Sequence, residues 1–204
     1  GKVKIRGFRN KDKIEGKILN ATITRESTGK YYISVIVVED LLVEKVTPTT
    51  IVGIDLGIKD LVVTSDGIKY SNLKVLMKYE KRLKRLQKEL SRREKGSKNY
   101  LKTKEKIARV HTKIKNYRKH YLNDIANEIV DEHDVIVTES LLVKDMFKDK
   151  RKAFNKNLSD AAVSTLRSLL EWKCRIKGKI YYKIDTYYPS SQICSHCGYK
   201  NSKL

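Results

Sequence analysis

The chain has 204 residues, of which 40% are hydrophobic, so it can bury a core in one large or two small domains, and wholesale disorder is not expected. Its 45 Lys and Arg residues against 24 Asp and Glu give a net charge of +21. A charge of this sign and size predicts a polyanionic partner, and nucleic acid is the one that we expect. The alternative is a highly soluble cationic protein without such a partner.

The sequence has no apolar run near the ~20 residues that cross a bilayer, and its first ten residues lack the apolar stretch of a signal peptide. We therefore expect a cytoplasmic protein with no membrane partner. The cysteines are Cys174, Cys194 and Cys197, and the C-x-x-C of the last two favours metal binding in a reducing compartment over a disulfide framework. Because the chain begins without Met and stops soon after this motif, we expect both ends to be cut.

Residues 1–47 have the pattern of β structure. The segments KILNATITRES and YYISVIVVED flank a turn at residues 28–30, which predicts a hairpin with one well-buried and one partly covered face. Two or three strands do not form a stable unit alone. We therefore expect the last part of a small barrel, joined to the main domain by the linker EKVTPTT.

Two short apolar runs, IVGID and LVVTS, then come on either side of a tight connection containing Gly57, and Asp66-Gly67 leads into a third short strand. Their β-branched content and flanking turn residues predict three consecutive antiparallel strands. Asp55 is expected to be a buried charge at the end of the first of them. Burying a carboxylate is costly unless cations or hydrogen bonds compensate it, so we expect a metal ion there.

Apolar residues next recur at steps of three and four over residues 73–90 and 107–129, with an interruption at Gly96-Ser97. This spacing predicts two amphipathic helices that pair as a long antiparallel hairpin, at about residues 73–132. A run of charge on a helix is commonly just a solvated face, but acids are sparse among the bases here, which favours contacts with phosphates.

The cationic residues that we expect to bind nucleic acid are those of the hairpin together with two from a later basic loop: Lys81, Arg82, Arg85, Lys88, Arg92, Arg93, Lys113, Arg118, Lys150 and Arg151.

The remaining pattern is a buried strand, DVIVTES, the basic loop, a helix through residues 161–176 and a last strand, KIYYKIDTYY. Three strands, a helical excursion, a strand, a helix and a strand is the order of a ribonuclease H-like α/β fold with a mixed sheet. In that topology the first and fourth strands are parallel neighbours, so Asp55 and Glu139 would face each other at the carboxyl edge of the sheet. Two carboxylates suit Mg²⁺ and phosphodiester cleavage. The alternative is that both are turn-capping or salt-bridged acids.

Three motifs together resemble one family. IVGIDLGIKDLVVTSDG, IVTESLLVKDM and YPSSQICSHCGYKN look like the RuvC-like nuclease domain of the TnpB (OrfB) proteins of insertion sequences, which are relatives of the type V CRISPR effector nucleases. The resemblance covers nearly the whole chain. It implies a bacterial or archaeal, nucleoid-associated DNA endonuclease that is directed to target DNA by a guide RNA.

The resemblance also implies a role for each part of the chain. Asp55 and Glu139 match the first and second catalytic acids, and Cys194 and Cys197 match the first half of a zinc ribbon over residues 189–204. Residues 1–47 resemble the end of a wedge-like barrel that grips guide RNA, and residues 48–188 the nuclease domain. The basic hairpin resembles helices that lie along the duplex of guide and target.

The chain departs from the family pattern in two ways. The second C-x-x-C and the third catalytic acid of the family would lie beyond Leu204. Structural zinc usually has four ligands, so Cys194 and Cys197 are a half site, and Cys174 is expected to be a buried thiol. With two acids the paired-ion chemistry is weakened, and we expect these 204 residues to bind nucleic acid with little nuclease activity.

Three functions are consistent with these features. The first is an RNA-guided, Mg²⁺-dependent DNA endonuclease of a transposable element. The second is a catalytically defunct relative that binds RNA or DNA, for example as a repressor. The third is a strand-joining transposase with the same fold and acid chemistry, which does not share the placement of the C-x-x-C. Retention of both Asp55 and Glu139 favours the first.

Overall fold

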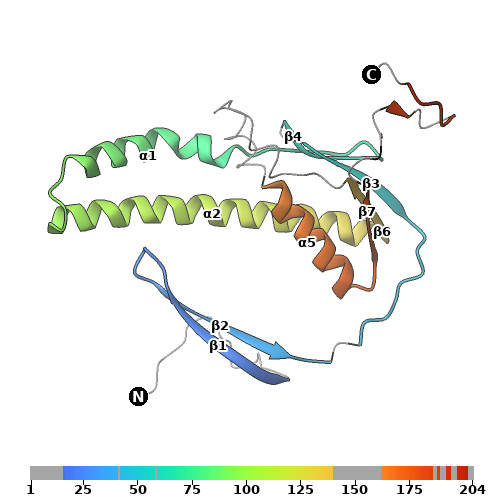
Figure 1. The fold of residues 1–204 in the computed structure, drawn as a ribbon, viewed down its shortest axis with the longest axis horizontal. Helices are drawn as coiled ribbons and strands as arrows, with labels where there is room; N and C mark the ends of the chain where they lie inside the picture. The colour runs from blue at the N-terminus through green and yellow to red at the C-terminus, as the bar shows by residue number, and fades with distance from the viewer. Residues whose placement is uncertain are drawn as a thin grey trace.

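The computed structural model describes residues 16–40, 42–57, 59–139, 162–185, 188, 192–193 and 197–201. These residues form a two-stranded ribbon, a five-stranded mixed sheet and helices that pack beside it (Figure 1). In chain order the elements are β1 (Lys17–Arg25), β2 (Tyr31–Val38), β3 (Ile51–Leu56), β4 (Asp60–Thr64), β5 (Lys69–Ser71), α1 (Val75–Ser91), α2 (Lys98–Glu132), β6 (Val135–Glu139), α5 (Val163–Ile176) and β7 (Ile180–Ile184).

The larger sheet has the order β5-β4-β3-β6-β7. Strands β3, β4 and β5 follow one another as an antiparallel meander, whereas β3 pairs in parallel with β6, and β6 in parallel with β7. The predicted parallel pairing of the IVGID and DVIVTES strands is therefore confirmed. The parallel steps need crossovers, and these are supplied by the α1–α2 hairpin and by the segment that ends in α5.

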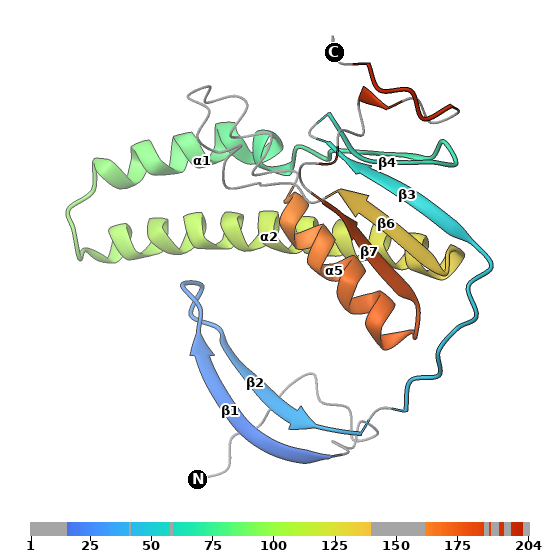
Figure 2. The same cartoon turned by 45° about the vertical axis from the view of Figure 1, so that its right-hand side comes forward.

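The core lies on one face of this sheet. Val52, Ile54 and Ile136 point to that face and are at most 4% exposed. They pack in one cluster with residues of both α2 and α5, among them Ile129 and Leu166. Figure 2 shows α5 crossing beside β6 and β7, with the C-terminal half of α2 behind. The alternation of buried and exposed residues along β3 follows directly from this one-sided covering.

The opposite face of the sheet is open in the part of the chain that the structure describes. Ile51 is 69% exposed, Tyr182 60% and Ile180 45%. Asp55 lies on this face and is exposed, so the expectation that its carboxylate is buried is wrong. The reason is positional: strand residues alternate between faces, and Asp55 falls between Ile54 and Leu56, which take the covered side.

The hairpin of α1 and α2 extends from the core as a second cluster. Leu83 and Leu86 of α1 pack against Val110 and Ile114 of α2, and the two helices lie side by side in both views (Figures 1 and 2). At the interruption predicted from sequence, the Ser97 side chain caps α2 by accepting a hydrogen bond of 3.1 Å from the backbone N–H of Tyr100. The predicted antiparallel helical hairpin is thus confirmed.

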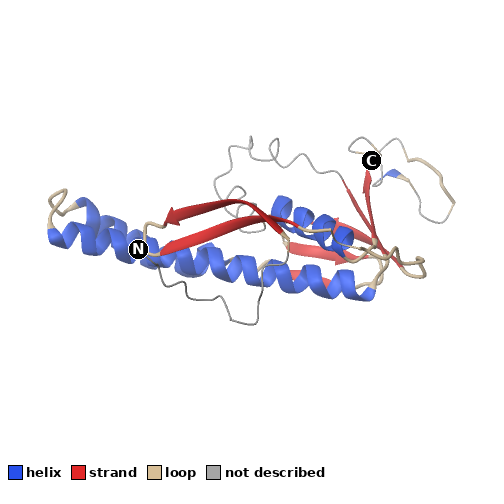
Figure 3. Ribbon diagram, turned by 90° about the horizontal axis from the view of Figure 1, so that it is seen from below, coloured by secondary structure: helices blue, strands red, loops and turns tan. Residues whose placement is uncertain are grey.

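The β1–β2 ribbon is antiparallel, as expected, but its predicted burial is wrong. All nine residues of β1 are exposed, and in β2 only Val37 is partly covered. Figure 1 shows the ribbon as a separate pair of strands below α2, and Figure 3 shows the same pair from below. The ribbon approaches the rest of the chain through Glu26, which forms an ion pair of 3.6 Å with Lys115 of α2. Two strands have no interior of their own, so their apolar residues stay exposed.

The linker before β3 is fixed to the end of the sheet by two sets of contacts. One carboxylate oxygen of Asp134 accepts hydrogen bonds from the backbone N–H and hydroxyl groups of Thr49 and Thr50, at 2.8–3.3 Å. The Lys179 ammonium lies 3.5 Å from the other oxygen of Asp134 and donates to the carbonyl oxygen of Val130, which lies in the last turn of α2. The linker thus joins the N-terminal edge of β3 to the ends of α2 and β7.

None of the helices among the described residues is both long and apolar enough to cross a membrane.

The turn between α5 and β7 depends on Gly178. Its φ is +67°, and a Cβ atom there would lie 1.9 Å from the carbonyl oxygen of Glu44 in the linker. We expect Gly178→Ala to lower the free energy of unfolding by more than the ~1–2 kcal/mol that the left-handed conformation costs, because the linker must also move. Urea denaturation measures the loss. Gly29→Ala is the control, since φ is also positive there but no atom lies within 4 Å; equal losses in the two variants would contradict the contact.

The hydrogen bonds on Asp134 predict an acid-sensitive fold. The backbone N–H of Thr49, followed by its hydroxyl, holds the pKa of Asp134 well below its usual range. A lowered pKa in the folded state stabilises the fold above the unfolded-state pKa of ~3.9, and this contribution is lost as the pH falls below that value. We expect the thermal midpoint of Asp134→Asn to depend less on pH between 5 and 3 than that of the parent chain. Exposed Asp40 gives the control, Asp40→Asn, and parallel curves for all three proteins would refute the assignment.

Candidate active site and nucleic-acid interface

The parallel register of β3 and β6 determines where the two predicted catalytic acids lie. Ile54 pairs with Thr138, and the next residue on each strand is Asp55 and Glu139. Both belong to the open face, because their neighbours Ile54 and Thr138 are buried on the other side. Asp55 is exposed and Glu139 is half-buried. The structure therefore brings the two carboxylates to adjacent strands at the same carboxyl edge, as expected from the sequence.

Local contacts fix the ends of these strands. The Ser65 backbone N–H donates a hydrogen bond of 2.8 Å to the carbonyl oxygen of Gly53, and the Ser65 hydroxyl oxygen accepts one of 3.0 Å from the Gly53 N–H. After Asp55 the chain turns at Gly57, where a Cβ atom would lie 2.6 Å from the carbonyl oxygen of Asp60. On the other strand, the hydroxyl of Thr138 is 2.8 Å from that of Tyr181. The backbone beneath the carboxylates is thus held by the sheet and by a turn that requires glycine.

The donor set fits magnesium better than a softer metal. Among the residues that the structure describes, no three or more His, Cys, Asp or Glu side chains are grouped so as to hold a metal ion. Two carboxylates on an exposed edge match the usual Mg²⁺ site, which keeps several waters and takes one or two protein carboxylates together with substrate phosphates. Asp55 and Glu139 could supply those two carboxylates.

Five of the cations expected to contact nucleic acid are exposed on α1 or, for Arg92, at its C-cap: Lys81, Arg82, Arg85, Lys88 and Arg92. Lys113 of α2 is exposed as well, whereas Arg93 and Arg118 are half-buried. Lys150 and Arg151 lie outside the described residues. The exposed cations predicted to bind nucleic acid are therefore concentrated along α1, and Lys113 is the exposed one of that predicted set on α2.

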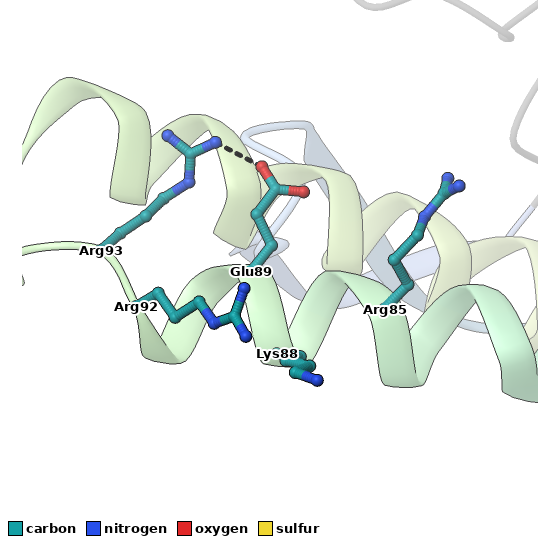
Figure 4. A pocket seen from close by; sticks show the side chains of 5 residues that line it. All are labelled: Arg85, Lys88, Glu89, Arg92 and Arg93. Atoms are coloured by element: carbon teal, nitrogen blue, oxygen red, sulfur yellow. Dashed lines mark hydrogen bonds and ion pairs between the residues drawn. The ribbon is translucent and has the colours of Figure 1, made fainter.

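Two shallow hollows adjoin each other along α1 and share Arg85. The first, drawn in Figure 4, is lined by Arg85, Lys88, Glu89, Arg92 and Arg93, and the second by Lys81, Arg82 and Arg85. Positions 81, 85, 88 and 92 are separated by four, three and four residues, so they form one row along the helix. At 1.5 Å per residue the row is about 16 Å long. A row of this kind can follow the phosphates of a nucleic-acid strand.

One acidic residue in this surface was missed by the sequence analysis. Glu89 accepts a hydrogen bond from the Arg93 guanidinium and another, at 3.2 Å, from the hydroxyl of Thr103 on α2. The Arg93 hydrogen bond is the main reason that the pKa of Glu89 is lowered from its ordinary value. The spacing of Glu89 and Arg93, i and i+4, is visible in the sequence. The contact with Thr103 depends on how the two helices pair, and no local pattern indicates it.

The cysteines divide into two kinds. Cys174 is 1% exposed, and burial raises the pKa of its thiol to about 11, as expected for a buried packing residue. Cys197 is exposed with a free thiol. Cys194 lies outside the described residues, so the half site for zinc stays a prediction.

The amino-acid sequence matches known families over most of its length. Residues 31–150 match the OrfB_IS605 family, described as a probable transposase, and residues 164–204 match the Cas12f1-like TNB domain. A "Putative RNA-guided DNA endonuclease" of Streptomyces pristinaespiralis is 37% identical over 90% of this chain and 45% of the relative. "Putative RNA-guided DNA endonuclease InsQ" of Escherichia coli K12 is 30% identical over 94% of this chain and 50% of the relative. The chain therefore spans about half the length of these curated relatives.

Two solved structures have a similar fold. A CRISPR-Cas12f ternary complex matches 87% of this chain and 37% of its own chain, with a TM-score of 0.52 and 22% identity. A Cas12f1-sgRNA-target DNA complex matches 88% of this chain and 45% of its own, with a TM-score of 0.50 and 21% identity. At these identities the likeness concerns the fold. Since the family match at residues 31–150 covers more than half of the sequence, the chain belongs to the OrfB (TnpB) family of insertion-sequence proteins.

Proposed function

We propose that this chain is the nuclease core of a transposon-encoded, RNA-guided DNA endonuclease. In this proposal Asp55 and Glu139 bind Mg²⁺ at the scissile phosphodiester, and the α1–α2 hairpin contacts the backbones of guide RNA and target DNA. The observation that carries it is the parallel register of β3 and β6, which places two carboxylates side by side at the carboxyl edge of a sheet. The names of the relatives and the net charge of +21 point the same way.

The proposal includes a finer assignment of the fold. We interpret the β5-β4-β3-β6-β7 sheet as ribonuclease H-like, because β3, β6 and β7 are parallel and β4 and β5 are antiparallel to their neighbours. Residues 48–188 would then be the RuvC-like domain. Residues 1–47 would be the end of a wedge-like barrel, and residues 189–204 the first half of a zinc ribbon. The exposed apolar residues of the β1–β2 ribbon support the barrel assignment, because a ribbon of this kind gains stability only from further strands or a covering layer.

The carboxylates and the cationic hairpin would have separate tasks. When bound, Mg²⁺ would activate water and stabilise the departing oxygen. Asp55 and Glu139 would hold the ion through oxygens on two neighbouring strands, and the β3–β6 pairing would fix their separation. The α1 cations would orient the nucleic acid through its phosphates, while base pairing supplies sequence specificity. Because Asp55 and Glu139 are two of the three acids that the family pattern implies, we expect the 204-residue chain to cleave DNA weakly.

The metal site is tested without any cleavage assay. Mn²⁺ is used as a paramagnetic stand-in for Mg²⁺, and the backbone amide signals of the chain are followed by NMR during the titration. We expect early broadening at Asp55, Leu56 and Glu139, because both carboxylates contact the ion, and loss of that broadening in Asp55→Asn and in Glu139→Gln. Excess Mg²⁺ should reverse it.

Exposed Asp40 lies outside both strands, and Asp40→Asn serves as the matched control. Broadening that persists at β3 and β6 in both site variants would count against the assignment of these acids as ligands.

Nucleic-acid binding by α1 is tested through its salt dependence. Each phosphate contact contributes about 0.9 to the slope of log affinity against log salt concentration, so replacing Arg85, Lys88 and Arg92 by Gln should lower the slope by up to about 3. The probe is a random-sequence RNA–DNA heteroduplex, measured by fluorescence anisotropy between ~50 and ~200 mM salt.

The control for this experiment removes the same charge elsewhere, by replacing exposed Lys45, Lys69 and Arg175 with Gln. A simple effect of net charge would weaken binding equally in both triple variants, and that result would exclude α1 as the specific interface.

A further inference from the structure

Glu89 is an unexpected residue in a surface that should bind phosphates. It lies in the first hollow of α1 among Arg85, Lys88, Arg92 and Arg93, and of the described residues that line this hollow it alone is acidic (Figure 4). A carboxylate at such a position repels a polyanion, and its presence therefore needs a compensating reason.

The geometry around Glu89 supplies such a reason. One oxygen of Glu89 accepts hydrogen bonds from both the Arg93 guanidinium and the hydroxyl of Thr103, which is 1% exposed between the two helices. The side chains of Arg93 and Glu89 are only 30% and 35% exposed. The second terminal nitrogen of Arg93 points away from Glu89 (Figure 4). Arg93 is thus held at the end of the hairpin by a contact that also includes α2.

We propose that Glu89 is a positioning residue for phosphate binding: it fixes Arg93 so that the guanidinium nitrogens of Arg93 that do not contact Glu89 meet a phosphodiester in an ordered arrangement. Arg85, Lys88 and Arg92 complete the hollow. The inference rests on the proposed function of α1 and assigns to it two residues, Glu89 and Thr103, that do not themselves contact the nucleic acid.

Physical considerations favour this role over simple repulsion. An arginine loses rotamer freedom when it binds a phosphate, and ordering it beforehand removes part of that cost. The guanidinium has five N–H donors in a fixed plane, so one side of it can bind Glu89 while the other remains available for an anion. The Glu89 carboxylate is ionised at neutral pH, and the hydrogen bond from Arg93 lowers its pKa further below the ordinary value, as expected for a contact that holds the charged form.

The two explanations predict opposite effects of Glu89→Gln on binding of a random-sequence RNA–DNA heteroduplex of about 20 base pairs. If Glu89 only repels, loss of its charge tightens binding. If it positions Arg93, binding weakens despite the more positive charge. We expect affinity to fall roughly three- to tenfold, with the salt slope lowered by about 0.9, equivalent to one phosphate contact. Unchanged or tighter binding would overturn the inference.

A double-mutant cycle tests whether Glu89 acts through Arg93. Arg93→Gln should weaken binding, and adding Glu89→Gln to it should cause no further loss. Additive losses would overturn the inference. Thr103→Val should reproduce part of the loss caused by Glu89→Gln, while Thr103→Ser, which keeps the hydroxyl, should bind as the parent chain does. Equal binding by the two Thr103 variants would contradict a role for the Thr103 hydroxyl of α2 in positioning Glu89.

The control is Glu94→Gln, which removes an exposed acid five residues further along. It should bind equally well or more tightly, and a loss like that of Glu89→Gln would contradict a specific role for Glu89. Circular dichroism checks that each variant keeps the hairpin. The triple variant of Arg85, Lys88 and Arg92 distinguishes failure of the proposed α1 interface from failure of the role of Glu89. If the triple variant binds normally, the α1 interface is wrong. If the triple variant binds more weakly but Glu89→Gln does not, only the role of Glu89 is wrong.

Discussion

The parallel pairing of β3 with β6 is the constraint on which the rest of the molecule depends. It joins residues 84 apart in the sequence, from Ile51 with Val135 to Ile54 with Thr138, and so requires the long crossover through α1 and α2. The same register aligns Asp55 with Glu139 and directs both to the open face. The crossover is thereby placed on the covered face, where α2 and α5 bury Val52, Ile54 and Ile136. Fold, candidate site and basic hairpin follow from one pairing.

Most of the strands and helices, and their order in the fold, could be predicted because local sequence patterns and the order of the motifs indicate them. The strand at IVGID, the turn at Asp66-Gly67 and the break at Gly96-Ser97 are signalled by neighbouring residues, and helical periodicity identified the hairpin. The exposure of Asp55 could not be predicted in the same way. An apolar run shows that a strand is buried on at least one face, but whether a second layer covers the other face depends on segments distant in the sequence.

The same limit explains the other differences. The alternation in β2 suggested one buried face, yet burial needs a partner layer, and the β1–β2 ribbon has only itself. The pairing of Glu89 with Arg93 follows from helical spacing, whereas its link to Thr103 arises only when α1 folds back on α2. Sequence reasoning thus identified the cations of the proposed interface, and the structure added the hydrogen bonds from Arg93 and Thr103 to Glu89.

Helix α2 belongs to both clusters of the fold, and this has a mechanical consequence. Its first half packs against α1, and its second half lies in the core of the sheet, where Lys179 caps its final carbonyls. At 1.5 Å per residue its 35 residues form a rod of about 52 Å. The part before Tyr121 projects beyond the core of the sheet by about 35 Å, so pivoting it by about 5° at the sheet moves its far end by about 3 Å, which is the scale of one hydrogen bond. His133 and Asp134 connect α2 directly to β6. A tilt of the hairpin is therefore coupled to the position of the strand that bears Glu139.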